Sequence, residues 1–146
     1  HNPHGAKALA ETISNEFTFD EVIGVVASFG DKDVRGILLL LEPIMNEIIV
    51  TTNSSPRAMK LSELEKLANE IFGKDRVTAI ESLSTAIDQA IKDAKRPLSD
   101  ESVGILITGS ASTVNINNYQ FVNNYRTKAI LTLHFLVSLQ NIYQKY

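Results

Sequence analysis

Four short apolar runs alternate along this chain with four segments whose apolar residues recur at helical spacing. The runs contain few polar residues, a pattern typical of strands buried on both faces, as in a parallel sheet. The alternating order therefore predicts an α/β fold with three layers, in which helices cover both faces of a mostly parallel, Rossmann-like sheet. The expected strands are 21–29, 46–52, 76–80 and 103–109, and the expected helices are 3–16, 34–44, 63–72 and 83–96.

Polar residues at the expected helix starts support these boundaries. Asn2 is suited to cap the first helix, with Pro3 at its first position, and Asp33 is suited to cap the second. Ser62 and Glu65 have the S-x-x-E spacing of a capping box, which predicts that Ser62 precedes the third helix.

The composition fits one ordinary globular domain and removes several classes of function. With 146 residues, 44% of them hydrophobic, the chain is long enough for one domain with a sizeable core. It has no cysteine, which excludes disulfides and thiol nucleophiles and is compatible with the cytoplasm, the predicted location. No apolar run approaches the roughly 20 residues that a membrane helix needs, so no membrane partner is expected.

Charge is unevenly distributed along the chain. The formal net charge is −3, and all 17 acidic residues lie at or before Glu101. The residues after Glu101 carry only three scattered cations, Arg126, Lys128 and Lys145. Binding to a phosphate backbone requires a dense basic footprint, so no nucleic-acid partner is expected.

The polar loops of the predicted sheet all fall on one rim. Ligands of open parallel sheets bind beyond the carboxyl ends of the strands. Here those ends are SFGDKD (28–33), TTNSSPR (51–57) and TGSAS (108–112). The phosphate-loop, dinucleotide, zinc-protease and nucleophile-elbow motifs are all absent from the sequence. We therefore take the candidate binding residues from this rim and expect no catalytic residue on this chain alone.

The first candidate is His1-Asn2-Pro3, at the start of a helix. Unpaired N–H groups and a partial positive charge at such a start can hold a phosphate or a carboxylate, and His1 can donate to an anion. The alternative is a capped helix that binds nothing.

Three further candidates lie in the strand-end loops. Asp31, Lys32 and Asp33 form an acid–base–acid turn that can orient a nucleotide or brace a neighbouring domain; the alternative is that Asp33 only caps a helix and Lys32 is solvated. Arg57 can pair with a phosphate or carboxylate, and the alternative is a surface arginine in a proline-containing loop. Ser110 offers a hydroxyl that donates and accepts, and the alternative is a turn former.

The residues after Val114 differ in character from the rest. The segment 115–146 is rich in Asn and Tyr and has no Gly or Pro. Apolar residues at helical spacing between Ile130 and Leu139 predict a terminal helix. We therefore divide the chain into a domain at 1–114 and an atypical tail at 115–146, a candidate foreign extension or translated frameshift. A divergent native helix is the alternative.

Four stretches occur in a specific order: HNPHGAKAL, VVASFGDKD, TTNSSPRAM and ILITGSASTV. Together they resemble the C-terminal domain of folylpolyglutamate synthase/dihydrofolate synthase, within the Mur ligase superfamily. The chain supplies H-N-P-x-G of the family motif D-[GA]-A-H-N-P-x-G as His1, Asn2, Pro3 and Gly5. The resemblance covers 1–114 and implies the Mur ligase C-terminal fold. It also implies that the chain is a fragment that starts inside this motif, after a larger ATPase domain.

The resemblance implies an ATP-dependent ligase that adds L-glutamate to folate or dihydropteroate through an acyl phosphate. The implied cofactors are ATP and Mg²⁺, with the metal ligands on the N-terminal ATPase domain, and the implied partners are that domain, L-glutamate, ATP and folate. The fragment is expected to be inactive alone. The resemblance assigns ATP or glutamate binding to His1, Asn2 and Ser110, and a place at the domain interface near the nucleotide to Asp31, Lys32, Asp33 and Arg57.

Two other functions stay open at the level of sequence. One is a freestanding α/β module that binds an anion or nucleotide at its helix start. The other is the C-terminal domain of another Mur-type ligase, such as one that builds peptidoglycan, although H-N-P followed by D-K-D favours the folate branch. The family commonly continues after G-S into an arginine-bearing final helix, which the segment 115–146 does not match.

Overall fold

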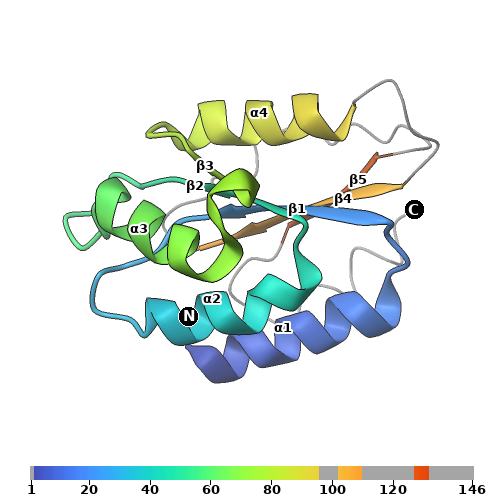
Figure 1. The fold of residues 1–146 in the computed structure, drawn as a ribbon, viewed down its shortest axis with the longest axis horizontal. Helices are drawn as coiled ribbons and strands as arrows, with labels where there is room; N and C mark the ends of the chain where they lie inside the picture. The colour runs from blue at the N-terminus through green and yellow to red at the C-terminus, as the bar shows by residue number, and fades with distance from the viewer. Residues whose placement is uncertain (1, 96–101, 110–126, 132–146) are drawn as a thin grey trace.

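A computed structural model describes residues 2–95, 102–109 and 127–131 of the chain. Within them, five parallel strands form one sheet in the order β3-β2-β1-β4-β5, and helices lie on both faces (Figure 1). The predicted α/β class and parallel sheet are therefore confirmed. The elements are α1 (Pro3–Glu16), β1 (Glu21–Val26), α2 (Val34–Leu41), η1 (Glu42–Ile44), β2 (Glu47–Val50), α3 (Leu61–Phe72), η2 (Lys74–Arg76), β3 (Val77–Ala79), α4 (Leu83–Ala94), β4 (Val103–Thr108) and β5 (Thr127–Leu131).

The middle strands are buried along almost their whole length. Every residue of β1 after Glu21 is buried, as is every residue of β4 before Thr108. Apolar side chains must then point to both faces, because successive side chains of a strand alternate between faces. This explains why the sequence of these strands shows continuous apolar runs with no polar alternation.

Two separate cores lie on the two faces of the sheet. Val22 and Val26 of β1 pack into one core with residues of α1, α2 and α3, whereas Ile23 and Val25 pack into the other with α4. Figure 1 shows this division, with α4 alone above the sheet and the other three helices below and in front of it. The right-handed crossovers of a parallel sheet produce such an arrangement when the strand order reverses.

Two of the three predicted helix caps are confirmed. Asn2 Oδ1 accepts from the Gly5 N–H at 2.8 Å, and Asp33 Oδ1 accepts from the Gly36 N–H at 2.9 Å. The capping box at Ser62 is wrong: α3 begins at Leu61, and Lys60 precedes it without a side-chain cap. Leu61 packs against the core, so burial of this residue extends the first turn toward the N-terminus. No helix in the described ranges is both long and apolar enough to cross a membrane.

The predicted terminal helix is wrong at Ile130 and Leu131, and the rest of it, up to Leu139, lies outside the described residues. Thr127–Leu131 form β5, which pairs in parallel with β4 from Val103 to Ile107. The pairing provides hydrogen-bond partners for backbone groups along an edge of β4 that would otherwise be open. Helical spacing in the sequence does not reveal this tertiary interaction. This part of the tail thus lies in the same sheet as β1 to β4. Residues 115–126 and 132–146 lie outside the described ranges.

Candidate functional site

Two loops at the carboxyl end of the sheet are joined through their backbones. One follows β1 (residues 27–33) and the other follows β2 (residues 51–60); we call them together the loop platform. Phe29 and Ala58 form an antiparallel bridge between them, so β1 ends at Val26 and not at Phe29 as predicted. Two backbone hydrogen bonds flank the bridge, from Gly30 N–H to Arg57 O at 3.0 Å and from Met59 N–H to Ser28 O at 2.9 Å.

Arg57 stands on this platform between an aromatic ring and a carboxylate. Its guanidinium carbon lies 4.8 Å from the centre of the Phe29 ring. Its Nη2 donates to Asp31 Oδ2, and the two side chains are 59% and 51% exposed. The hydrogen bond from Arg57 holds the pKa of Asp31 below its ordinary value, so Asp31 is ionised at neutral pH.

The second loop is ordered by its own polar side chains. Asn53 Oδ1 accepts from the Ser55 N–H at 2.9 Å, and Ser55 Oγ accepts from the Arg57 N–H at 3.2 Å. The buried Thr51 hydroxyl donates to the carbonyl of Glu81, in front of α4, at 3.2 Å. These bonds fix the backbone that carries Arg57, although its side chain is at the surface.

The starts of α1 and α2 lie side by side at the same rim. A Cβ added at Gly36, in the first turn of α2, would lie 3.0 Å from Cγ of Pro3 in α1. The positive ends of two helix dipoles therefore meet beside the loop platform, where they favour anions. Asn2 and Asp33 each accept from one first-turn N–H group; Pro3 has no N–H, and the Val34 N–H donates to Lys32 O at 2.8 Å.

The sheet reverses its strand order between β1 and β4, next to the platform. Ala27 N–H donates to Thr108 O at 3.2 Å, and a Cβ at Gly109 would lie only 2.9 Å from the carbonyl oxygen of Ala27. A side chain at position 109 would thus collide with the β1 backbone, which accounts for glycine there. Such a reversal is the usual ligand position in open parallel sheets.

The structure brings together only some of the predicted site residues. Asp31 and Arg57 are in direct contact, and Asn2 and Asp33 cap adjacent helices. Lys32 is exposed within the first loop. His1 and Ser110 lie outside the described residues, so their predicted roles stay predictions. For Asn2 and Asp33, helix capping accounts for the hydrogen bond that each side chain makes.

Sequence reasoning missed Phe29. This residue was treated as the last residue of a buried strand, whereas its ring supports Arg57 and its backbone joins the two loops. The available signal was an aromatic residue directly before the polar turn Gly30–Asp33, at a rim where a neighbouring loop supplies an arginine. The sequence does not reveal that Arg57 is the arginine that contacts the Phe29 ring. The two residues are 28 positions apart, and their contact depends on how the chain folds.

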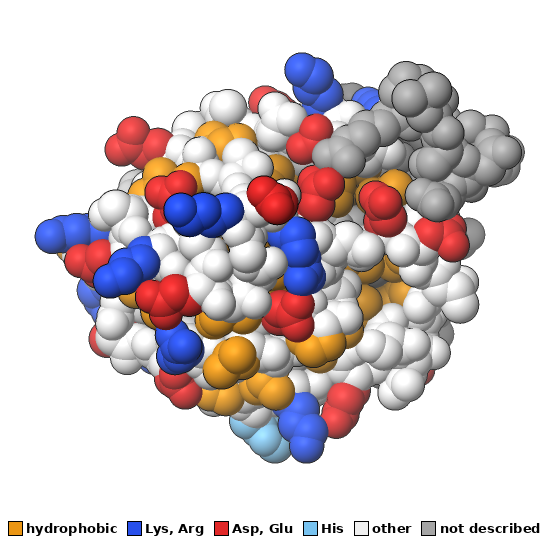
Figure 2. Space-filling view, viewed as in Figure 1, with side chains coloured by type: hydrophobic (Ala, Val, Ile, Leu, Met, Phe, Trp, Pro, Cys, Tyr) orange, Lys and Arg blue, Asp and Glu red, His pale blue; other side chains and the backbone are white. Residues whose placement is uncertain are grey.

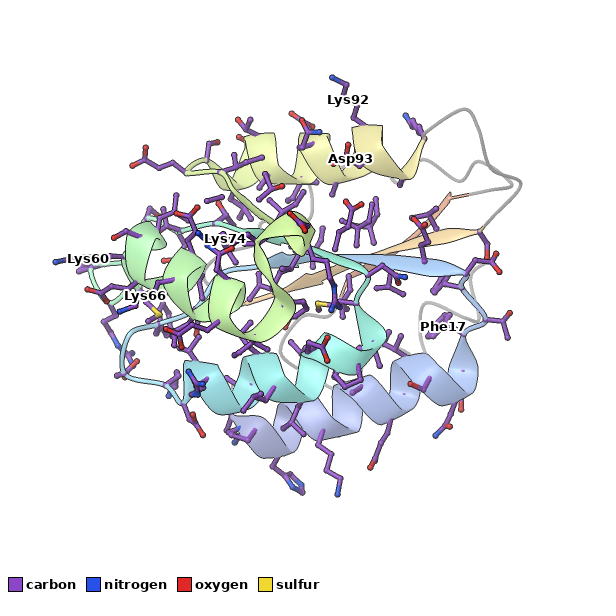
Figure 3. The ribbon with its side chains drawn as sticks, viewed as in Figure 1. Phe17, Lys60, Lys66, Lys74, Lys92 and Asp93 are labelled. Atoms are coloured by element: carbon purple, nitrogen blue, oxygen red, sulfur yellow. The ribbon has the colours of Figure 1, made fainter. Side chains whose placement is uncertain are left out.

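The positive charge of the platform is local. Figure 2 shows basic and acidic side chains interspersed over the viewed face. Figure 3 shows Lys60 projecting from the platform end of the molecule, and Phe17 at the opposite end. Among the described residues, no three His, Cys, Asp or Glu side chains lie close enough to hold a metal ion. What the platform offers a ligand is cationic and N–H donor groups.

The comparisons with known proteins agree with this architecture. The family model described as Mur ligase, glutamate ligase domain, matches residues 1–111. The dihydrofolate synthase/folylpolyglutamate synthase of Mycobacterium tuberculosis is 46% identical over 121 residues, which cover 77% of this chain and 25% of the relative.

Solved structures give the same result in three dimensions. A crystal structure of Mycobacterium tuberculosis folylpolyglutamate synthase with ADP and AMPPCP superimposes with a TM-score of 0.71 at 47% identity, over 77% of this chain and 26% of that one. The bifunctional enzyme of Yersinia pestis, in complex with AMPPNP and Mn, superimposes with a TM-score of 0.58 at 25% identity, over 75% of this chain and 24% of that one.

The chain thus spans about a quarter of the length of the relatives that it matches. The matched residues 1–111 of this chain include β1 to β4, the loop platform and the starts of α1 and α2. By its family match the chain belongs to the Mur ligase, glutamate ligase domain family, and the relatives that it resembles in sequence and fold are dihydrofolate synthase/folylpolyglutamate synthases.

Proposed function

We propose that the chain is the C-terminal substrate domain of a cytoplasmic, ATP-dependent ligase that adds L-glutamate to folate or dihydropteroate. The observation that carries the proposal is the loop platform, which presents Arg57 beside two helix starts at the strand-order reversal. This chemistry suits phosphate and carboxylate groups, and both reactants, ATP and L-glutamate, carry them.

In the proposed reaction ATP first phosphorylates a folate carboxyl group and ADP leaves. The amino group of L-glutamate then attacks the carbonyl carbon of the acyl phosphate, loses a proton and displaces inorganic phosphate, which forms the amide bond. The task of this chain is to hold anionic groups in position for that attack and, with the ATPase domain, to exclude water from the cleft. His1, Asn2 and Ser110 are proposed to face ATP or glutamate, and Asp31, Lys32, Asp33 and Arg57 the domain interface near the nucleotide.

ATP and Mg²⁺ enter the proposal in different ways. The Arg57 guanidinium of the platform and the positive ends of α1 and α2 beside it fit the phosphates of a nucleotide. Mg²⁺ prefers several oxygen ligands, and the described residues contain no cluster of acidic or histidine side chains, so we assign its ligands to the ATPase domain. In the bound complex the metal would neutralise phosphate charge, and no step on this chain depends on it.

A chimera tests the proposal. The C-terminal quarter of the Mycobacterium tuberculosis relative is replaced by this chain, and glutamate-dependent ADP release is measured with folate or dihydropteroate. We expect ligation by the chimera and none by the isolated chain. Ligation by the isolated chain would contradict the proposal. A folded chimera whose ADP release does not depend on glutamate would contradict it as well. Substitution of alanine for His1 or Ser110 in the active chimera should reduce turnover, and unchanged turnover would remove those two assignments.

A further inference from the structure

We propose that Phe29 and Asp31 are positioning residues, which hold the Arg57 guanidinium in one orientation so that its remaining N–H donors face an anionic substrate group. The inference deepens the proposed function and rests on it. It assigns a role to Phe29, and it changes the role of Asp31 from a group near the nucleotide to a partner of Arg57.

The backbone of Phe29 is fixed relative to the backbone of Arg57. The antiparallel bridge to Ala58 and the bond from Gly30 N–H to Arg57 O lock the backbone of both partners against each other. The guanidinium carbon lies 4.8 Å from the ring centre, within the range of a cation–π contact. One face of the planar guanidinium is therefore covered, which restricts a ligand to its edge or its other face.

Asp31 fixes the rotation of the guanidinium about the axis through this ring. It accepts from Nη2, and among the described residues the other N–H donors of Arg57 have no side-chain acceptor. An arginine has five N–H donors arranged as a rigid fork, so a carboxylate at one corner sets the direction of the rest. The remaining donors suit a phosphate or carboxylate oxygen.

The charge balance supports positioning over simple pairing. Arg57, and to a lesser extent Lys32, lower the pKa of Asp31, and the Asp33 carboxylate of the same loop accepts from the Gly36 N–H. The adjacent starts of α1 and α2 contribute partial positive charge beside the platform. An anion that reaches the free donors of Arg57 therefore does not need to displace Asp31.

The test uses the active chimera with Phe29→Leu, Phe29→Tyr, Asp31→Asn and Arg57→Ala. We expect Phe29→Leu and Asp31→Asn to raise the KM of one anionic substrate by about threefold to tenfold with little change in kcat. Phe29→Tyr keeps the aromatic ring, so its KM should equal that of the wild type. Separate titrations of ATP and L-glutamate show whether the anion is a phosphate or a carboxylate. Phe17→Leu, at the opposite end of the molecule (Figure 3), is the matched control and should leave both KM values unchanged.

A second measurement on the isolated chain needs no activity. Trypsin cleaves after arginine only when the side chain and the local backbone are released, so Phe29→Leu should speed cleavage at the Arg57–Ala58 bond at an unchanged unfolding midpoint. Unchanged KM values and unchanged cleavage in Phe29→Leu and Asp31→Asn would overturn the inference, as would a lower KM in Asp31→Asn, which indicates competition. If Arg57→Ala alone raises a KM, the anion site stands and the positioning role falls. If the chimera shows no ligation, the proposed function fails, and an unchanged rate of tryptic cleavage then rejects the positioning role as well.

Discussion

The molecule contains the same trio of side chains at both ends of its sheet. At the carboxyl end, Arg57 lies over the ring of Phe29 and pairs with Asp31. At the amino end, Arg76 lies 5.1 Å from the centre of the Phe72 ring and also pairs with a carboxylate. The two arginines thus share an aromatic and an acidic partner, but the structure uses them differently.

The difference lies in the backbone carbonyls that surround each arginine. Arg76 donates to the Glu42 carboxylate at 2.6 Å and to the backbone oxygens of Glu42, Met45 and Asn46, and its side chain is 35% exposed. Arg57 is 59% exposed, and its side chain donates to Asp31 alone among the described residues. Four hydrogen bonds therefore hold the arginine at one end as a structural joint, whereas the arginine at the other end makes one side-chain hydrogen bond among the described residues.

The largest expected effect separates the two arginines by stability. Arg76→Met removes a half-buried donor and leaves three backbone carbonyls in front of β2 and β3 without it, so it should lower the free energy of unfolding by about 2 kcal/mol. Arg57→Met should lower the midpoint of urea unfolding only slightly at neutral pH, because exposed ion pairs contribute little. Equal losses in the two variants would contradict the contrast between the two ends. Arg76→Lys, which keeps the charge and loses the fork, should fall between wild type and Arg76→Met.

A smaller effect is expected at the helix starts of the carboxyl end. Asn2→Ala and Asp33→Ala each remove a side-chain cap and should cost about 1 kcal/mol of stability, whereas Asn2→Asp and Asp33→Asn keep an acceptor and should cost little. Ser62→Ala is the control, because α3 starts at Leu61 without a side-chain cap. A loss of about 1 kcal/mol in Ser62→Ala as well would restore the capping box that the structure excludes. The measurement is equilibrium unfolding at neutral pH.

Most of the fold was predictable because local and tertiary signals agree. The first helix begins at Pro3 and ends at Glu16 as predicted, where a cap, a proline and an apolar stripe coincide. Residues 127–131 show the opposite case. Ile130 and Leu131 begin the spacing that favours a helix, yet both lie in a strand paired with β4, and that pairing depends on an edge distant in sequence.

The candidate site was predictable as a set of loops but not as contacts. The carboxyl-end rule identified the segments that contain Asp31 and Arg57, because strand order follows from the alternation of elements. The ion pair between them and the place of Phe29 depend on how two loops, 26 residues apart at their charged groups, meet in space. No local pattern in either loop contains that information.

The smallest expected effect is on how stability depends on pH in the acid range, and it compares Asp20 with Asp31. The backbone N–H and hydroxyl of Ser102, at 2.7 and 2.8 Å from Asp20 Oδ2, hold the pKa of Asp20 below its ordinary value of 3.8. A carboxyl group whose pKa is lower in the folded state stabilises the fold above its unfolded pKa, and this contribution is lost as pH falls through the folded value. Each group should therefore stabilise the chain fully at neutral pH and progressively less below about pH 4.

Asp20→Asn should flatten the decline of stability with falling pH, and Ser102→Ala should flatten it less, because it removes only the hydroxyl hydrogen bond and keeps the backbone N–H bond to Asp20. Asp31→Asn should flatten it too, but in that case Arg57→Met should have the same effect, because Arg57 is the main cause of the lowered pKa of Asp31. Urea midpoints measured at pH intervals in the acid range test this. Curves that run parallel to wild type in all four variants would show that neither carboxylate is linked to folding. If the pH dependence of stability changes in Ser102→Ala but not in Arg57→Met, only Asp20 is linked to folding. The linkage then lies at the amino end of the sheet, the end at which Arg76 stabilises the fold.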